Sequence, residues 1–222
     1  MDSVLFLILA AVYMILFAYG FILMKLDSRP GLRYLLLFVT AGLVWDNAII
    51  GAGIFIGEGP LLEQLNVTRY WIHAVATPLL AIVSYDLIRQ AGSPWARKKA
   101  AAVGAWLFTA ALIVVELITE TLPLVVEPSL EYGALRYVPV EASGPPLMVI
   151  VILVPLLAAG ITAWRRNKSP LLLIGTILMA LGSAFPIPIE SSAVTNVFEL
   201  LLLVSLWLTI RKLTFSRTVS LP

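Results

Sequence analysis

The chain has 222 residues, of which 60% are hydrophobic and only 13% are charged, and its mean hydropathy is +0.98. A soluble domain of this length could not cover its surface with so few charges, so the composition excludes one and predicts a polytopic membrane protein. The absence of cysteine excludes disulfides, thiolate metal sites and cysteine nucleophiles. The net charge is only +2, which gives no reason to expect a nucleic-acid partner.

Seven apolar stretches follow one another along the chain, each near the roughly 20 residues needed to cross the hydrocarbon core of a bilayer. They cover residues 4–24, 34–57, 69–88, 100–119, 146–164, 170–187 and 191–210. The longest polar break between them, residues 120–145, contains several prolines and the β-like piece "LRYVPV", which predicts an ordered surface loop or a hairpin. We therefore expect an all-α polytopic fold in which residues 1–222 form a single seven-helix transmembrane domain.

The basic residues indicate how the chain is oriented. Thirteen of the 15 lie in breaks 25–33, 89–99 and 165–170 and in the C-terminal tail, whereas only Arg69 and Arg136 fall on the other side. The positive-inside rule then predicts an N-terminus outside, a C-terminus in the cytoplasm and an extracytoplasmic loop at 120–145. We expect this membrane to be a plasma membrane or an endomembrane. On the outer side, "NVT" at 66–68 fits a glycosylation sequon at Asn66.

Two carboxylic acids interrupt the apolar spans. Asp46 stands near the centre of span 34–57, and Glu199 lies within span 191–210. A charged side chain at mid-span costs about 2.5–3.5 kcal/mol even on a lenient insertion scale, so both side chains are expected to face the interior of the bundle. Arg69 and His73 are four residues apart and share one helical face of span 69–88. These four residues are the predicted catalytic group.

Further polar and aromatic residues cluster toward the same outer half of the spans and are predicted to bind a substrate: Trp45, Asn47, Trp71, Glu116, Glu120, Glu190 and Asn196. Arg69 is expected to form an ion pair with an acid, and the favoured candidates are Glu120, Glu190 and Glu199. Structural alternatives exist for several of these side chains. Arg69 could anchor its helix in lipid headgroups, His73 could be a hydrogen-bonded interior histidine, and Glu116 and Glu120 could be solvated at the interface.

Buried carboxylic acids among apolar walls suit proton transfer. Burial favours the neutral form of a carboxylic acid, so Asp46 or Glu199 could donate a proton to an epoxide, an alkene or an ether oxygen. Other chemistries lack their residues: no lysine lies deep in a span for a retinal-type Schiff base, one histidine cannot ligate a bis-histidine haem, and there is no DDxxD motif for a diphosphate. His73 and several serines leave a Ser–His–Asp hydrolase open as an alternative, although no G-x-S-x-G elbow indicates one. We expect no metal and no cofactor.

The acid after the tryptophan in "VWDN" and the second acid in "NVFEL", on seven spans of about this total length, resemble the integral-membrane terpene cyclases of fungal meroterpenoid and indole-diterpene pathways. In that family a pair of acids protonates an epoxide or alkene and guides cyclisation, so the resemblance implies these roles for Asp46 and Glu199. The family usually has Glu after the tryptophan, where this chain has Asp, and no motif of the family aligns with Arg69 or His73.

The sequence therefore predicts a membrane-embedded enzyme that carries out protonation, cyclisation or isomerisation of a lipid or isoprenoid in the outer half of the bilayer. A small proton- or cation-coupled transporter or channel could use the same carboxylates, and a receptor or assembly factor is a third possibility. The inner halves of the spans are nearly bare apart from Ser84 and Asp86, which disfavours a transporter. Cytoplasmic loops of about 5–12 residues are ordinary connections, which disfavours a receptor. The oligomeric state is not predicted.

Overall fold

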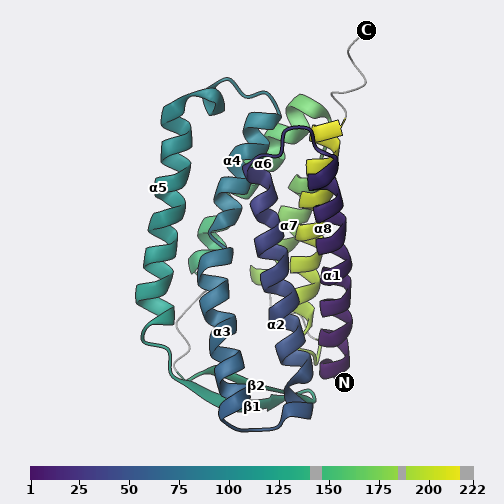
Figure 1. The fold of residues 1–222 in the computed structure, drawn as a ribbon, viewed down its shortest axis with the longest axis vertical. Coiled ribbons are helices and arrows are strands. Elements are labelled where there is room, and N and C mark those ends of the chain that lie inside the picture. The colour runs from purple at the N-terminus through teal and green to yellow at the C-terminus, as the bar shows by residue number, and fades with distance from the viewer. Residues whose placement is uncertain (141–146, 185–188, 216–222) are drawn as a thin grey trace.

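A computed structural model describes residues 1–140, 147–184 and 189–215 of the chain. The described part is an upright bundle of helices closed at one end by a β-hairpin (Figure 1). The elements are α1 (Asp2–Leu26), the short 3-10 helix η1 (Leu32–Leu35), α2 (Leu36–Ile56), α3 (Pro60–Ala76), α4 (Leu79–Gln90), η2 (Trp95–Arg97), α5 (Lys99–Glu116), the π-turn η3 (Leu117–Thr121), β1 (Val126–Glu131), β2 (Ala134–Pro139), α6 (Leu147–Asn167), α7 (Leu171–Ala184) and α8 (Val194–Phe215). The fold is mostly helical, as the sequence predicted.

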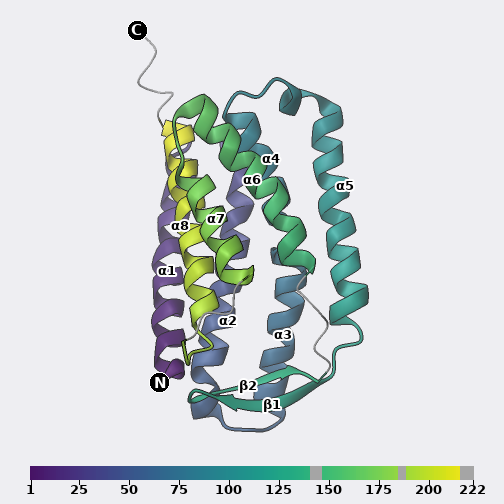
Figure 2. The ribbon, with the colours of Figure 1, turned by 180° about the vertical axis from the view of Figure 1, so that it is seen from behind.

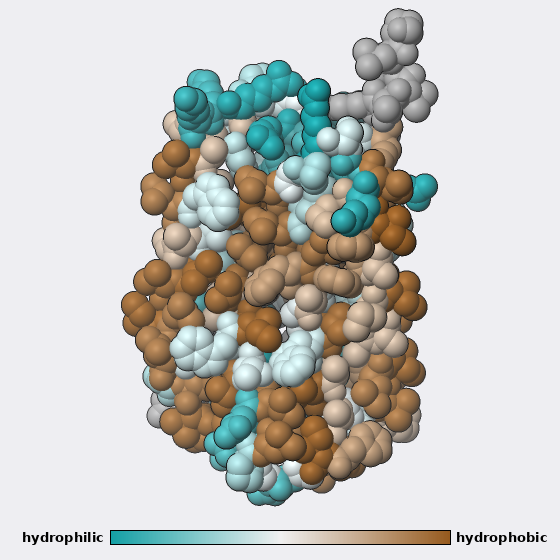
Figure 3. Space-filling model, in the orientation of Figure 1, coloured by the Kyte–Doolittle hydropathy of each residue, from teal (hydrophilic) through white to brown (hydrophobic). Residues whose placement is uncertain are grey.

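Six helical segments of the described part are long and apolar enough to cross a membrane: Asp2–Leu26, Leu32–Ile56, Pro60–Gln90, Lys99–Thr121, Met148–Asn167 and Val194–Phe215. The remaining apolar helix, α7, has 14 residues, or about 21 Å at 1.5 Å per residue. The sequence had placed a full span at 170–187; the helix ends at Ala184, and residues 185–187 lie outside the described ranges. On the face that Figure 3 shows, apolar side chains cover most of the middle of the bundle, and hydrophilic ones gather toward its two ends. That distribution is the one expected of a membrane protein.

The third long segment consists of two helices, α3 and α4, separated at Thr77 and Pro78. Pro78 has no N–H to bond the carbonyl four residues earlier, so the helical ladder is interrupted there. At the other end, Pro60 occupies the first turn of α3, where the missing N–H costs nothing. The stretch between the predicted spans 34–57 and 69–88 is mostly helical, because α3 begins at Pro60, nine residues before the predicted start of the second of these spans.

The break at 120–145 contains an antiparallel hairpin in its described part, which confirms the expected hairpin. Strands β1 and β2 pair from Val126–Pro139 to Glu131–Ala134. Tyr132 and Gly133 connect them with φ of 49° and 80°, the left-handed conformation that a two-residue turn of type I′ needs at both positions. Gly53 of α2 lies directly under the hairpin, since a Cβ there would come within 1.8 Å of the Leu135 carbonyl oxygen.

The hairpin lies across one end of the bundle, which we call the hairpin end (Figures 1 and 2). Tyr70 of α3 donates its hydroxyl to the Tyr137 carbonyl at 3.1 Å, and Ser3 of α1 donates to the Gly133 carbonyl at 2.6 Å. The carboxylate of Asp2 accepts hydrogen bonds from Ser191 and Ser192, just before α8. Helices α1, α3 and α8 are thereby held in register at this end.

Large side chains fill the opposite half of the bundle. Trp207 of α8 is completely buried, packs at 6.3 Å from the Tyr34 ring and donates its indole N–H to Thr40 at 3.2 Å. It fits because Gly20 of α1 leaves the space: a Cβ on Gly20 would come within 2.4 Å of the indole ring. Since this half is closely packed, space for a ligand is to be sought nearer the hairpin end.

Candidate functional site

An ion pair joins α2 to α3 in the hairpin half of the bundle. The Arg69 guanidinium donates from Nε to Oδ1 of Asp46 at 2.8 Å, with Arg69 only 9% exposed and Asp46 27% exposed. The prediction that Arg69 pairs with an acid is confirmed, and the anchor alternative is wrong. The partner is Asp46, however, and not one of the three acids favoured from the sequence. Because Asp46 is the carboxylate of an ion pair, it is a poor choice for the neutral proton donor that the sequence allowed it to be.

Asn66 supports the same guanidinium from the side. Its Oδ1 accepts a hydrogen bond from Nη1 of Arg69, and its Nδ2 donates to the Leu62 carbonyl at 2.7 Å. Asn66 is completely buried. A glycan could not be attached to an amide enclosed in this way, so the structure contradicts glycosylation at the 66–68 sequon. The sequence signal was misleading because Asn66 lies inside a helix and not in the outer loop where it was placed.

The four predicted catalytic residues surround one cavity of about 70 Å³, which we call the central cavity. Asp46 comes from α2, Arg69 and His73 from α3, and Glu199 from α8. Helices α6 and α7 complete the wall with apolar side chains, among them Leu156 and Met179. The predicted convergence of these polar groups on one space is therefore present, and apart from them and Thr77 the wall is apolar.

Glu199 differs from Asp46 in its surroundings. It makes no hydrogen bond or ion pair with any residue of the described ranges, although it is half-buried and lines the central cavity. An unpaired carboxyl group in apolar surroundings costs less with a proton than without one. Of the two mid-span acids, Glu199 is therefore the one placed to carry a transferable proton.

His73 stands on the wall between two cavities. Its Nε2 lies 3.2 Å from the Thr77 hydroxyl, one helical turn away, and its ring lines the central cavity. The ring also lines a second cavity of about 570 Å³ beside the hairpin, which we call the hairpin cavity. Glu116 and Glu120 line this second cavity and not the first, so His73 is the one predicted catalytic residue that shares a cavity with them in the described part of the chain.

The two predicted tryptophans do not face the central cavity. Trp45 is 38% exposed and donates its indole N–H to Thr68 of α3 at 3.0 Å, and Trp71 is also exposed. Both lie on the outer surface of the bundle, where a membrane protein meets lipid. Neither tryptophan lines either cavity in the described part of the chain, so substrate contact by these two residues is not supported by their placement.

The two predicted asparagines bind each other across the bundle. Asn196 of α8 donates Nδ2 to Oδ1 of Asn47 at 3.1 Å, and Asn47, completely buried, donates to the Leu43 carbonyl. They join α2 to α8 beside the cavity without lining it. Glu190 is exposed ahead of α8, also outside both cavities. Depth along a span and helical phase cannot distinguish a cavity wall from a helix interface, so they could not show that these three residues lie outside the cavity.

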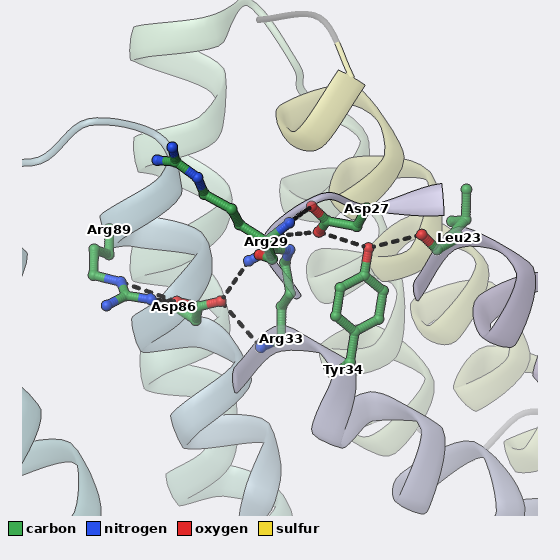
Figure 4. A network of polar contacts seen from close by, with 7 residues as sticks. All are labelled: Leu23, Asp27, Arg29, Arg33, Tyr34, Asp86 and Arg89. Carbon is green, nitrogen blue, oxygen red and sulfur yellow. Dashed lines mark hydrogen bonds and ion pairs between the residues drawn. The ribbon is translucent and has the colours of Figure 1, made fainter. Parts of the chain in front are cut away.

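A second polar network, at the end opposite the hairpin, was missed (Figure 4). Arg33 is only 2% exposed and forms ion pairs with Asp27 and with Asp86, the latter at 3.1 Å. Arg89 binds the other oxygen of Asp86 at 2.6 Å, and the Tyr34 hydroxyl donates to Asp27 at 3.0 Å. Arg33 and Arg89 had been counted only as loop charges. The available signal was that Asp27 and Asp86 are acids on a side otherwise rich in basic residues.

Among the described residues, no group of three or more acidic or histidine side chains is arranged to hold a metal ion. The site consists of two carboxylic acids, an arginine and a histidine around a cavity whose wall is otherwise mostly apolar. Comparison of the sequence with protein-family models and with curated proteins found no match.

Proposed function

We propose that the chain is a seven-helix integral membrane protein with its N-terminus and hairpin outside and its C-terminus in the cytoplasm. The basic residues of the described loops support this orientation, because most of them lie at the end opposite the hairpin. In this arrangement α7 forms the sixth span. The central cavity then belongs to the outer half of the membrane, in a plasma membrane or an endomembrane.

We further propose that the protein is an enzyme that protonates a lipid or isoprenoid substrate and thereby cyclises or isomerises it. The observation that carries this proposal is the convergence of Asp46, Arg69, His73 and Glu199 on one otherwise apolar cavity. Apolar walls accept a hydrocarbon chain and exclude water, which makes each fixed charge act more strongly on a bound molecule.

Each residue has a distinct role in the proposed reaction. Glu199 donates its proton to a double bond or an epoxide oxygen, and a carbocation forms on the substrate as Glu199 becomes a carboxylate. The Asp46 carboxylate, held in position by Arg69, faces the developing positive charge and stabilises it. Loss of a proton from another carbon ends the reaction, so cyclisation or isomerisation consumes no net proton. Arg69 acts as a positioning residue.

A proton- or cation-coupled transporter would need a path to the opposite end of the bundle. The fully buried Trp207 and the ion pairs of Arg33 occupy that end, which favours the enzyme. Because that end is closely packed, we also propose that a substrate reaches the central cavity only from the hairpin side. A transport assay nevertheless belongs among the tests, since the two functions share their carboxylates.

The test compares the wild type with Glu199→Gln and with Glu190→Gln, a matched exchange at an exposed acid. Each protein is purified with its copurifying lipids, which are identified by mass spectrometry, and each is incubated with total lipid extract of the expression host. We expect the wild type and Glu190→Gln to convert an isoprenoid or other lipid into an isomer of equal mass. Glu199→Gln should be slower by about 10²–10⁴-fold, the usual contribution of a general acid. Unchanged lipids together with pH-driven uptake into proteoliposomes would show a transporter instead.

A further inference from the structure

The hairpin cavity differs in kind from the central cavity. At about 570 Å³ it is much the larger, and six of its eleven lining residues are polar: Tyr70, His73, Glu116, Thr119, Glu120 and Thr121. In liquid water each molecule takes up about 30 Å³, and a polar cavity of this size admits water readily. The central cavity is narrow and mostly apolar. The hairpin cavity therefore suits water and the central cavity suits an apolar molecule, and we call them the wet and the dry compartment.

The wet compartment depends on a local irregularity of the chain. Residues Leu117–Thr121 form a π-turn at the end of α5, closed by a bond of 2.8 Å from the Leu122 N–H to the Leu117 carbonyl. The extra residue in such a turn alters which side chains face inward, and π-turns are often found at functional sites. Here Glu116, directly before this turn, and Glu120, within it, both line the hairpin cavity.

His73 is the one residue that lines both cavities within the described part of the chain. Thr77, which lies against its Nε2, lines only the central cavity. Nδ1 of the ring has no partner among the described residues and is free to exchange a proton with water. An imidazole can accept a proton at one nitrogen and release another from the second, which makes histidine the usual proton shuttle. Arg69, its neighbour on the helix face, cannot serve because a guanidinium does not lose its proton in proteins.

We infer that His73 carries protons between water in the hairpin cavity and Glu199 in the central cavity, with Glu116 and Glu120 collecting protons on the wet side. The inference rests on the proposed function, in which Glu199 must regain its proton whenever the product loses one to water. One proton enters the ring at Nδ1 from water in the hairpin cavity, and another leaves from Nε2 to the Glu199 carboxylate. The ring returns to its first tautomer when the side chain turns toward the hairpin cavity, where water removes the Nδ1 proton and supplies one to Nε2. The charged and titratable groups around the ring are Asp46, Arg69 and Glu199 on the dry side and Tyr70, Glu116 and Glu120 on the wet side.

The test needs no substrate, because it follows the exchange of the Glu199 proton for deuterium. The purified protein in detergent is mixed rapidly with D₂O, and the C=O stretch of the protonated carboxyl is followed by infrared spectroscopy as COOH becomes COOD. The band that is missing from Glu199→Gln is the Glu199 band. Backbone amide exchange in the same spectra shows whether each variant keeps its fold and its access to solvent.

We expect His73→Ala to slow this exchange by about 10²-fold or more, the range that a positioned proton-transfer group contributes in enzymes. Free imidazole, small enough for the hairpin cavity, should restore the rate in His73→Ala and leave Glu199→Gln unaffected. Thr119→Ala is the matched control: Thr119 lines only the hairpin cavity and bonds its own helix at the Val115 carbonyl, so its exchange should stay at the wild-type rate.

The outcomes separate the two proposals. A Glu199 band that exchanges in His73→Ala as fast as in the wild type overturns the shuttle and leaves the proposed enzyme intact. Absence of any protonated Glu199 band in the wild type removes the proton donor of the proposed reaction itself. A slow exchange in His73→Ala that imidazole does not restore, with normal amide exchange, also overturns the shuttle, because it shows that the side chain positions the site and does not carry the proton.

Discussion

Arg69 and Asp46, 23 residues apart, are joined by a bond of 2.8 Å that ties α3 to α2 at the wall of the central cavity. Removing one partner leaves the other without its counter-charge. We expect Asp46→Asn and Arg69→Gln each to lower the free energy of unfolding by about 1–3 kcal/mol, the cost of an unsatisfied buried polar group. The double variant should lose less than the sum of the two, as measured by denaturation in detergent.

The hairpin offers a control for this comparison of single and double variants, which is a double-mutant cycle. Arg136 and Glu131 form an ion pair of 2.9 Å in which Glu131 is 49% exposed. Exposed pairs contribute about 0.2–1 kcal/mol, so the Arg136→Gln and Glu131→Gln cycle should show a weaker coupling. Strictly additive effects at Asp46 and Arg69 would mean that the ion pair does not form in the folded protein.

The Arg33 network should matter more for stability. Arg33 is buried between two carboxylates, so Arg33→Gln leaves Asp27 and Asp86 short of positive charge. Breaking a buried ion pair on one side costs about 3–5 kcal/mol. Arg29→Gln serves as the control, because the Arg29 side chain is exposed and only its backbone takes part in the network. Equal melting temperatures for the two variants would contradict the network's role.

Acid should weaken the fold partly through Asp27. Burial raises the pKa of the Asp27 carboxyl, but hydrogen bonds from the Arg29 N–H and the Tyr34 hydroxyl and the charge of Arg33 outweigh it and hold the pKa below its ordinary value. A carboxyl with a lowered pKa stabilises the fold above its unfolded pKa, and this stabilisation is lost as the pH falls through the folded pKa.

We therefore expect the wild type to lose stability as the pH falls below about 4, near the pKa of an unfolded aspartate. Asp27→Asn should be less stable than the wild type at pH 7. It should also lose less stability than the wild type when the pH is lowered from 5 to about 3. Melting temperatures of both proteins across this range, in one detergent, give the comparison. Parallel pH profiles would show that Asp27 does not contribute to the acid sensitivity.

The proposed orientation can be tested on intact cells, because the chain has no native cysteine. Glu127 of β1 and Ser28 of the α1–η1 connection are both exposed, at opposite ends of the bundle. Glu127→Cys should react with a membrane-impermeant maleimide, and Ser28→Cys should react only after the cells are opened. The reverse pattern would invert the proposed topology and place the hairpin cavity in the cytoplasm.

The sequence alone predicts the helical spans and the hairpin, because both depend on local properties. A run of about 20 apolar residues is helical in lipid, where every backbone group must be bonded within the chain. The same local reasoning finds Asp46 and Glu199, since a carboxyl group at mid-span is costly wherever it faces. It also places Arg69 and His73 on one face of a helix, because a spacing of four residues is a property of the helix itself.

The partners of these side chains were decided by the tertiary structure. Arg69 binds Asp46 and not the acids expected first, Arg33 reaches Asp86 53 residues away, and Asn196 binds Asn47 across 149 residues. Helical phase gives the face on which a side chain lies, but contact also depends on which helices are neighbours and on their relative height. Those are settled by how the helices pack over long separations in sequence. The same packing puts Asn66 inside the protein and places His73 between the central cavity and the hairpin cavity.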